Sequence, residues 1–134
     1  MEMYVTQDEN KFEKDFYERL LEVMPDNKEL MTELAAWYTD NGDFAKGLVL
    51  DLRLASLYAD DPYVWYNLAC SHSLCGDADA ACAALTEAVI RGYDEVDRML
   101  EDSDLTFARE SAAFERFMDK AQVLFDSEEE NNHG

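Results

Sequence analysis

The stretch that decides the fold is residues 61–81, which reads DPYVWYNLACSHSLCGDADAA. Asp61 followed by Pro62 is typical of a helix start, because proline in the first turn of a helix sacrifices no hydrogen bond. Gly76 then ends this first helix, and Asp77 is suited to cap a second one. The stretch is therefore predicted to form two amphipathic helices joined by a tight turn.

The same pattern occurs once earlier in the chain. Equivalent residues lie 34 positions apart, and the matched pairs are Leu34 and Leu68, Ala35 and Ala69, Gly42 and Gly76, and Asp43 and Asp77. This offset is the period of a helix–turn–helix repeat. Repeats of this kind stack so that each covers the apolar face of its neighbour. We therefore predict two repeat-like helix pairs, at about 26–59 and 60–92.

These pairs resemble the tetratricopeptide repeat (TPR) family. The residues that match its pattern of a Trp, a Leu, small residues and a Gly-Asp turn are Trp65, Leu68, Ala69, Gly76, Ala81 and Ala88, while Tyr38 and His72 occupy its helix-A aromatic position. The resemblance implies an all-α, TPR-like α-solenoid of antiparallel helix pairs, with about seven helices and a C-terminal capping helix. It also implies a concave groove, lined by the first helix of each pair, in which ligand segments lie.

The helical domain is predicted to span residues 11–126, between a flexible N-terminus at 1–10 and a disordered acidic tail at 127–134. Its first helix ends at Pro25, because the residue before a proline avoids helical angles. This helix is interpreted as the second half of an incomplete repeat that covers the next pair. The residues expected to be buried on it are Phe12, Phe16, Leu20 and Val23, with Tyr17 and Leu21 widening the stripe.

The helix predicted at 44–58 is apolar almost all round, with Asp51 among its few interruptions. Such a helix is usually buried between neighbours, which is the favoured interpretation here. The alternative is that it leaves an apolar patch for a partner or a second copy to cover.

The segment 93–126 resembles the ending of bacterial repeat arrays, with a Gly-aromatic step at Gly92-Tyr93, an Asp-x-Asp-Leu turn at 102–105 and a last helix carrying spaced Phe residues. The resemblance implies a short helix at about 94–101 and a closing helix at about 111–126. The apolar face of the closing helix is predicted to comprise Phe114, Phe117, Met118, Ala121, Leu124 and Phe125.

Charge is the outstanding feature of the composition, since 31 acidic residues stand against 11 basic ones and the formal net charge is −20. This excess argues against binding to nucleic acid or to an anionic membrane, and it attracts basic partners. It also serves solubility. No signal peptide or membrane-spanning segment is expected. Three cysteines crowded into one repeat are read as free thiols, which indicates the reducing cytoplasm.

The sequence contains few candidates for catalysis, and we expect neither an enzyme nor a cofactor. His72 is interpreted as a packed histidine, and no Ser/His/Asp or Cys/His set is legible. Cys70, Cys75 and Cys82 with His72 could be regarded as a zinc cluster, but zinc favours closely spaced Cys pairs on turns. The Asp102-x-Asp104 pair lacks the Gly and the final Glu of a calcium loop. No metal site is therefore predicted.

The candidate partner-binding residues come from the first helix of each pair. They are Glu29, Thr32, Glu33 and Ala36 from the first pair, and Tyr63, Tyr66, Asn67 and Cys70 from the second. Asn67 matches an Asn of family members that clamp the terminal carboxylate of heat-shock chaperones, but the Lys and Arg residues of that clamp are missing. An acidic ligand would be repelled. The groove therefore favours a basic or amphipathic segment, with Tyr63 and Tyr66 as aromatic anchors unless they pack against a neighbouring helix.

The sequence thus predicts a non-enzymatic protein–protein interaction module, an adaptor or scaffold that binds a basic or amphipathic polypeptide. The alternative is a small acidic TPR chaperone of a secreted or partly unfolded client. A monomer and a homodimer both remain open.

Overall fold

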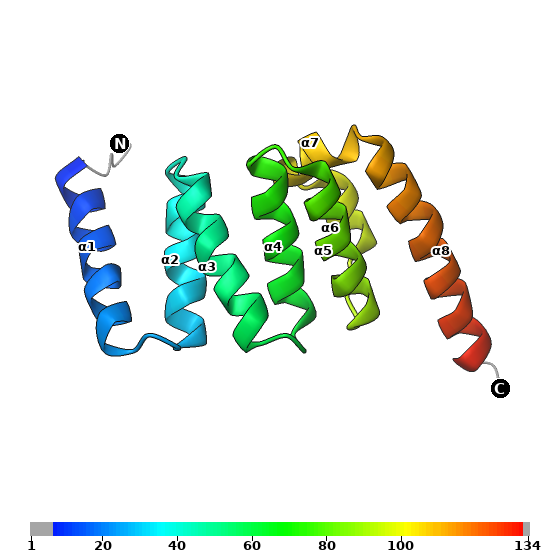
Figure 1. Cartoon of the computed structure of the whole chain (residues 1–134), viewed down its shortest axis with the longest axis horizontal. Coiled ribbons are helices and arrows are strands. Elements are labelled where there is room, and N and C mark those ends of the chain that lie inside the picture. Colours follow the sequence, from blue (N-terminus) through cyan, green and yellow to red (C-terminus); the bar gives the residue numbers. More distant parts are fainter. Residues whose placement is uncertain (1–6, 133–134) are drawn as a thin grey trace, which may run out of the picture.

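The structure, a computed structural model, describes residues 7–132 (Figure 1). In that range the chain forms eight α-helices, one 3-10 helix and no strand, so the predicted all-α class is confirmed. None of the helices described is both long and apolar enough to cross a membrane. The elements are α1 (Gln7–Val23), α2 (Lys28–Asp40), α3 (Phe44–Leu57), α4 (Pro62–Leu74), α5 (Ala78–Ile90), α6 (Val96–Glu101), the 3-10 helix η1 (Ser103–Leu105), α7 (Thr106–Arg109) and α8 (Ala112–Asn132).

The repeat spacing found in the sequence is visible in the helices themselves. Both the starts and the ends of α2 and α4 are separated by the same offset as the matched residue pairs. Gly42 and Gly76 follow these helices with φ angles of 83° and 80°, in a left-handed region that residues with a Cβ rarely adopt. After Gly76, the backbone N–H of Asp77 donates to the carbonyl of His72 at 3.0 Å, and the Asp77 side chain caps α5. The turn chemistry predicted for residues 61–81 is therefore present.

The helices pack largely in chain order. From α1 to α5 each helix contacts the next, and α8 packs against α5. Figure 1 shows α1 at one end of this row and α8 at the other. α3 lies close against α2 at Gly47, where a Cβ would lie 2.9 Å from Oγ1 of Thr39 and 3.4 Å from the carbonyl oxygen of Ala35. The largest side chains that are fully buried include Met31, Leu34, Leu54, Leu85, Met99 and Leu105.

Ala69 lies in α4 and is completely buried. We expect Ala69→Trp to destabilise the protein by about 1–3 kcal/mol, because a larger side chain cannot be accommodated without shifting the neighbouring helices. Thermal unfolding followed by circular dichroism measures this effect. The matched control is Ala45→Trp at an exposed position of α3, where little change is expected. Equal melting temperatures for the two variants would contradict the packing described here.

The buried face predicted for α1 is partly wrong. Phe12, Phe16 and Val23 are 73%, 51% and 78% exposed, and the residues that pack against the core are Tyr17 and Leu21. Apolar residues occupy two faces of this helix, and its main helical neighbour, α2, covers one of them. The rings of Phe12 and Phe16 stack on each other, with 6.4 Å between their centroids. We call Phe12, Phe16 and Val23 the outer stripe of α1.

Both interpretations of the apolar helix α3 hold in part. Leu50, Leu54 and Ala55 are buried, whereas Val49 and Leu52 are largely exposed. The helix thus contributes to the core on one side and leaves apolar atoms accessible on the other.

The C-terminal third differs from the prediction in two places. The turn expected at 102–105 forms a 3-10 helix that is followed by the short helix α7, which brings the number of α-helices to eight rather than seven in the described range. The closing helix α8 continues to Asn132, so the disorder predicted from residue 127 is not seen over 127–132. Glutamate is a good helix former, and Glu128–Glu130 extend the helix instead of ending it. Of the predicted flexible N-terminus, residues 7–10 are helical, whereas residues 1–6, like 133–134, lie outside the described residues.

Candidate binding groove

A hollow of about 160 Å³ lies between α2, α4 and the segment that follows α6. Four carboxylates line it: Asp40 at the end of α2, Asp51 of α3, Asp102 just before the 3-10 helix and Asp104 within it. Arg98 of α6 is the one cationic side chain among the described residues that line it. We call this hollow the acidic pocket.

The structure brings four of the eight predicted partner-binding residues to this pocket. Thr32 and Ala36 line it from α2, and Asn67 and Cys70 line it from α4. Ala36 and Cys70 are counterparts 34 positions apart, so both helices contribute an equivalent repeat position to the hollow.

The other four predicted residues do not line the pocket. Glu29 and Glu33 are exposed on α2, on the helical face that also carries Thr32. Tyr63 is 50% exposed at the start of α4, with its ring edge-on to that of Tyr93. All three lie in the first half of the two helices that line the pocket.

The prediction that Tyr66 is an anchor for a partner is wrong. Tyr66 is 1% exposed, and its ring stacks on that of Tyr93 with 4.5 Å between the centroids. Its hydroxyl donates to Oδ2 of Asp102 at 2.7 Å. Burial, reinforced by the Asp102 carboxylate, raises the pKa of Tyr66 above its ordinary range. Tyr66 instead packs against a neighbouring segment of the chain, which was the alternative interpretation that the sequence left open.

Asp51 is the most deeply buried carboxylate of the pocket. It is 5% exposed and accepts a hydrogen bond on Oδ2 from the hydroxyl of Ser71. Burial raises the pKa of Asp51 to about 6, although the hydrogen bond from Ser71 opposes part of the rise. Within the described residues no Lys, Arg or His forms an ion pair with it. At pH 7 this group is therefore mostly ionised and carries a charge that is poorly solvated.

Asp102 connects the pocket to the packed tyrosines. Besides the Tyr66 hydroxyl, it accepts the backbone N–H of Asp104 on Oδ1 at 3.0 Å, which caps the 3-10 helix. The guanidinium of Arg98 lies with Nε 4.0 Å from Oδ2 of Asp102 and with its Cζ 5.0 Å from the centre of the Tyr66 ring. Burial, and then the charges of Asp102 and Asp40, raise the pKa of Asp104. The pocket thus has an excess of negative charge that Arg98 offsets at Asp102.

A possible metal-binding set in the described residues is formed by Cys70, Asp102 and Asp104, one ligand atom of each lying within 4.8 Å of the others. It includes neither Cys75 nor Cys82 nor His72, the residues that the sequence suggested. Burial raises the pKa of the Cys70 thiol, which disfavours the thiolate that a metal requires. Asp102 is also already a hydrogen-bond acceptor on both oxygens. This set therefore fits a metal ion poorly.

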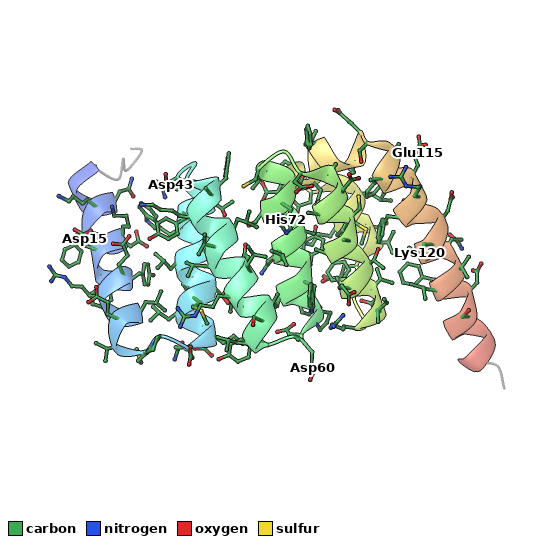
Figure 2. The ribbon with its side chains drawn as sticks, viewed as in Figure 1. Asp15, Asp43, Asp60, His72, Glu115 and Lys120 are labelled. Atoms are coloured by element: carbon green, nitrogen blue, oxygen red, sulfur yellow. The ribbon has the colours of Figure 1, made fainter. Side chains whose placement is uncertain are left out.

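The other cysteines and His72 show no arrangement suited to nucleophilic catalysis in the part of the chain that the structure describes. Burial raises the pKa of Cys75 and Cys82, so both thiols favour the unreactive protonated form. His72 lies on α4 (Figure 2) and is half-buried. Burial lowers its pKa. It is therefore neutral at pH 7 and forms no side-chain hydrogen bond with the described Ser or Cys residues.

A second hollow, of about 460 Å³, lies between α1, α2 and α3. Its walls are mainly apolar and include Leu21, Leu34 and Val49. The hydroxyl of Tyr38 donates to Glu18 at 2.6 Å across it, which ties α1 to α2. We call it the apolar hollow.

Comparison with models of known protein families finds no match, and comparison with curated proteins finds none either. The functional assignment therefore depends on the residues themselves. The sequence did contain a signal for the residues that were missed. Asp51 is one of the few charged residues in a mainly apolar helix, and Asp102 and Asp104 form a conspicuous Asp-x-Asp pair. The sequence pattern did not show that Asp51 and this pair lie at one pocket.

Proposed function

We propose that this chain is a non-enzymatic protein–protein interaction module, an adaptor or scaffold that binds a basic or amphipathic polypeptide across α2 and α4. The observation that carries the proposal is the acidic pocket, in which four carboxylates and one cation surround a hollow that α2 and α4 both line. Opposite charges steer a ligand to such a surface and fix its orientation. The free cysteines agree with a location in the reducing cytoplasm, which is part of the proposal.

The flanking residues extend this surface beyond the pocket. Glu29 and Glu33 add exposed negative charge on α2, and the half-exposed ring of Tyr63 offers an aromatic contact on α4. An extended or helical segment with basic residues would meet carboxylates along its whole length. Aromatic side chains with low conformational entropy are favourable anchors for such a segment.

We also propose that the helices form a TPR-like α-solenoid. Three observations support it: the repeat spacing between α2 and α4, the left-handed glycines after both helices, and packing largely in chain order. In a solenoid each repeat contacts its neighbours, and the repeats together present an extended binding face.

The charges at the rim provide the test of the binding proposal. We expect Glu29→Lys with Glu33→Lys to slow the association of fluorescein-labelled basic peptides by about tenfold and to flatten its salt dependence, because the variant loses electrostatic steering. Stopped-flow fluorescence anisotropy at several salt concentrations measures both quantities.

The matched control is Glu115→Lys with Asp119→Lys on α8. These residues are also exposed and one helical turn apart, so the net charge changes equally at a site remote in sequence from α2 and α4. Figure 2 shows Glu115 at the outside of the bundle. If the two double variants lost association rate equally, bulk charge would explain the binding and the proposed surface would be refuted.

A small acidic chaperone for a partly unfolded client is the second candidate. The observations that favour it are the outer stripe of α1 and, separately, the apolar hollow, each of which presents apolar atoms that a non-native chain could contact. A client held there would lie against α1 and α3. Its binding would then be insensitive to the charges at Glu29 and Glu33, so the same experiment separates the two functions.

A further inference from the structure

The acidic pocket has an unmatched charge at its most buried point. Asp40, Asp51 and Asp104 form no ion pair with any side chain in the described residues, and Arg98 lies beside Asp102 with half of its own side chain exposed. A buried carboxylate without a cation is costly, because the charge loses most of its hydration and the single hydrogen bond from Ser71 replaces only part of it. A cation from outside the chain would recover that loss.

One oxygen of Asp51 is available to such a cation. The Ser71 hydroxyl donates to Oδ2, while no described residue donates to Oδ1. The residue is only 5% exposed, yet it is part of the pocket lining. Oδ1 is not among the fully buried polar atoms that lack a partner, so this oxygen of a pocket-lining residue retains some access to solvent.

The size of the pocket limits what enters it. A volume of about 160 Å³ is below the roughly 300–1,000 Å³ typical of sites for drug-sized ligands. It suits the head group of one side chain. Carboxylates line the pocket from three elements, Asp51 on α3, Asp40 on α2 and Asp104 in the 3-10 helix, so an occupant with several N–H donors could meet more than one of them.

We infer that the acidic pocket binds the guanidinium group of an arginine side chain from the partner polypeptide, with the buried carboxylate of Asp51 as its principal acceptor. A guanidinium offers five donors in a rigid plane, remains charged when desolvated, and is less strongly hydrated than an ammonium group. This inference rests on the proposed function, since the arginine belongs to the segment that lies across α2 and α4.

A metal ion is the competing occupant. It would use Cys70, Asp102 and Asp104, whereas Asp51 lies outside that set. The two occupants therefore differ in the residue on which they depend.

Butylguanidinium tests the inference directly, with butylammonium, sodium chloride at equal ionic strength, and calcium as comparison ligands. Each is titrated into the ¹⁵N-labelled full chain at pH 7.5 and followed by amide chemical shifts. We expect butylguanidinium to give saturable shifts at Ala36, Asn67 and Ser71, which surround the pocket, and to bind more tightly than butylammonium. Equal response to the two organic cations, or saturation of these amides by calcium alone, would overturn the inference.

The matched variants are Asp51→Asn and Asp119→Asn, each of which removes one negative charge. We expect Asp51→Asn to weaken butylguanidinium binding by about tenfold or more and Asp119→Asn to leave it unchanged. Asparagine has nearly the same shape as aspartate, and a circular dichroism spectrum confirms that both variants are folded. Unaltered binding by Asp51→Asn would refute the role of Asp51.

The guanidinium site and the proposed binding function can be refuted separately. If basic peptides bind with the dependence on Glu29 and Glu33 described above but butylguanidinium does not saturate the pocket, the guanidinium site is wrong and the module remains. If no basic peptide binds, the proposed function itself is wrong, whatever the small cation does.

Discussion

Asp51→Asn is expected to stabilise the folded protein at pH 7 by up to about 3 kcal/mol. The pKa of Asp51 is about 6 in the folded protein, against an ordinary value of 3.8, and each unit of difference is worth about 1.36 kcal/mol. Because the folded pKa is raised, the favourable contribution of the protonated carboxyl is complete below the unfolded pKa. It is lost as the pH rises through about 6. Asparagine removes the charge while retaining an acceptor for the Ser71 hydroxyl.

The measurement is urea unfolding of the wild type, Asp51→Asn and the surface control Asp119→Asn at pH 7 and pH 4. Most of the advantage of Asp51→Asn should disappear at pH 4, where the folded wild type already carries a protonated carboxyl. An advantage that is independent of pH, or a loss of stability at pH 7, would show that Asp51 is not buried as an unpaired charge.

Tyr66→Ala is expected to destabilise the protein by about 3–5 kcal/mol, the usual cost of truncating a buried aromatic side chain. Tyr66 is 1% exposed, its ring stacks on that of Tyr93, and its hydroxyl is a hydrogen-bond donor to Asp102. The substitution leaves a cavity and removes that donor from a mostly buried carboxylate. Urea unfolding at pH 7 measures the loss.

Tyr63→Ala is the matched control, because Tyr63 contacts the same Tyr93 ring but is 50% exposed. We expect its free energy of unfolding to change by about 0.5 kcal/mol or less. If the two alanine variants were equally stable, Tyr66 would not be the packed residue that the structure describes.

The helices were predictable from the sequence because their ends are marked by local chemistry. Pro25, Gly42, Gly76 and Gly92 each lie where a helix ends or has just ended, and the three glycines have positive φ angles. A four-residue helix such as α7 is too short to show a period, so it was missed.

The buried faces were harder to predict than the ends. On α1 both Phe16 and Tyr17 fit an apolar stripe, and a helix with two such stripes does not reveal which one its neighbour will cover. Which stripe is buried depends on how α1 crosses α2, and that crossing is set by the packing of the folded protein.

The pocket shows the same limit at the level of the site. Ala36 and Cys70 could be identified because they occupy equivalent positions of a repeat. Asp51 and Asp104 reach the same hollow from different elements, one from the second helix of a pair and the other from the capping segment. Their proximity arises because the segment after α6 folds back over α4. No periodic pattern in the sequence predicts this contact.

The packing of each helix mainly on its neighbours in the chain also bears on how the protein folds. Each contact between successive helices, from α1 to α5, closes only a short loop of chain. The conformational entropy lost in forming one helix pair is therefore offset by that pair's own contacts before the next pair forms. Chains with such local contacts fold rapidly, and folding can begin within either pair and spread outward. At the α1 end of the row, one apolar face has no neighbouring helix among the described residues, so local unfolding should begin there, and α2, which lines the acidic pocket, is the next helix in the row.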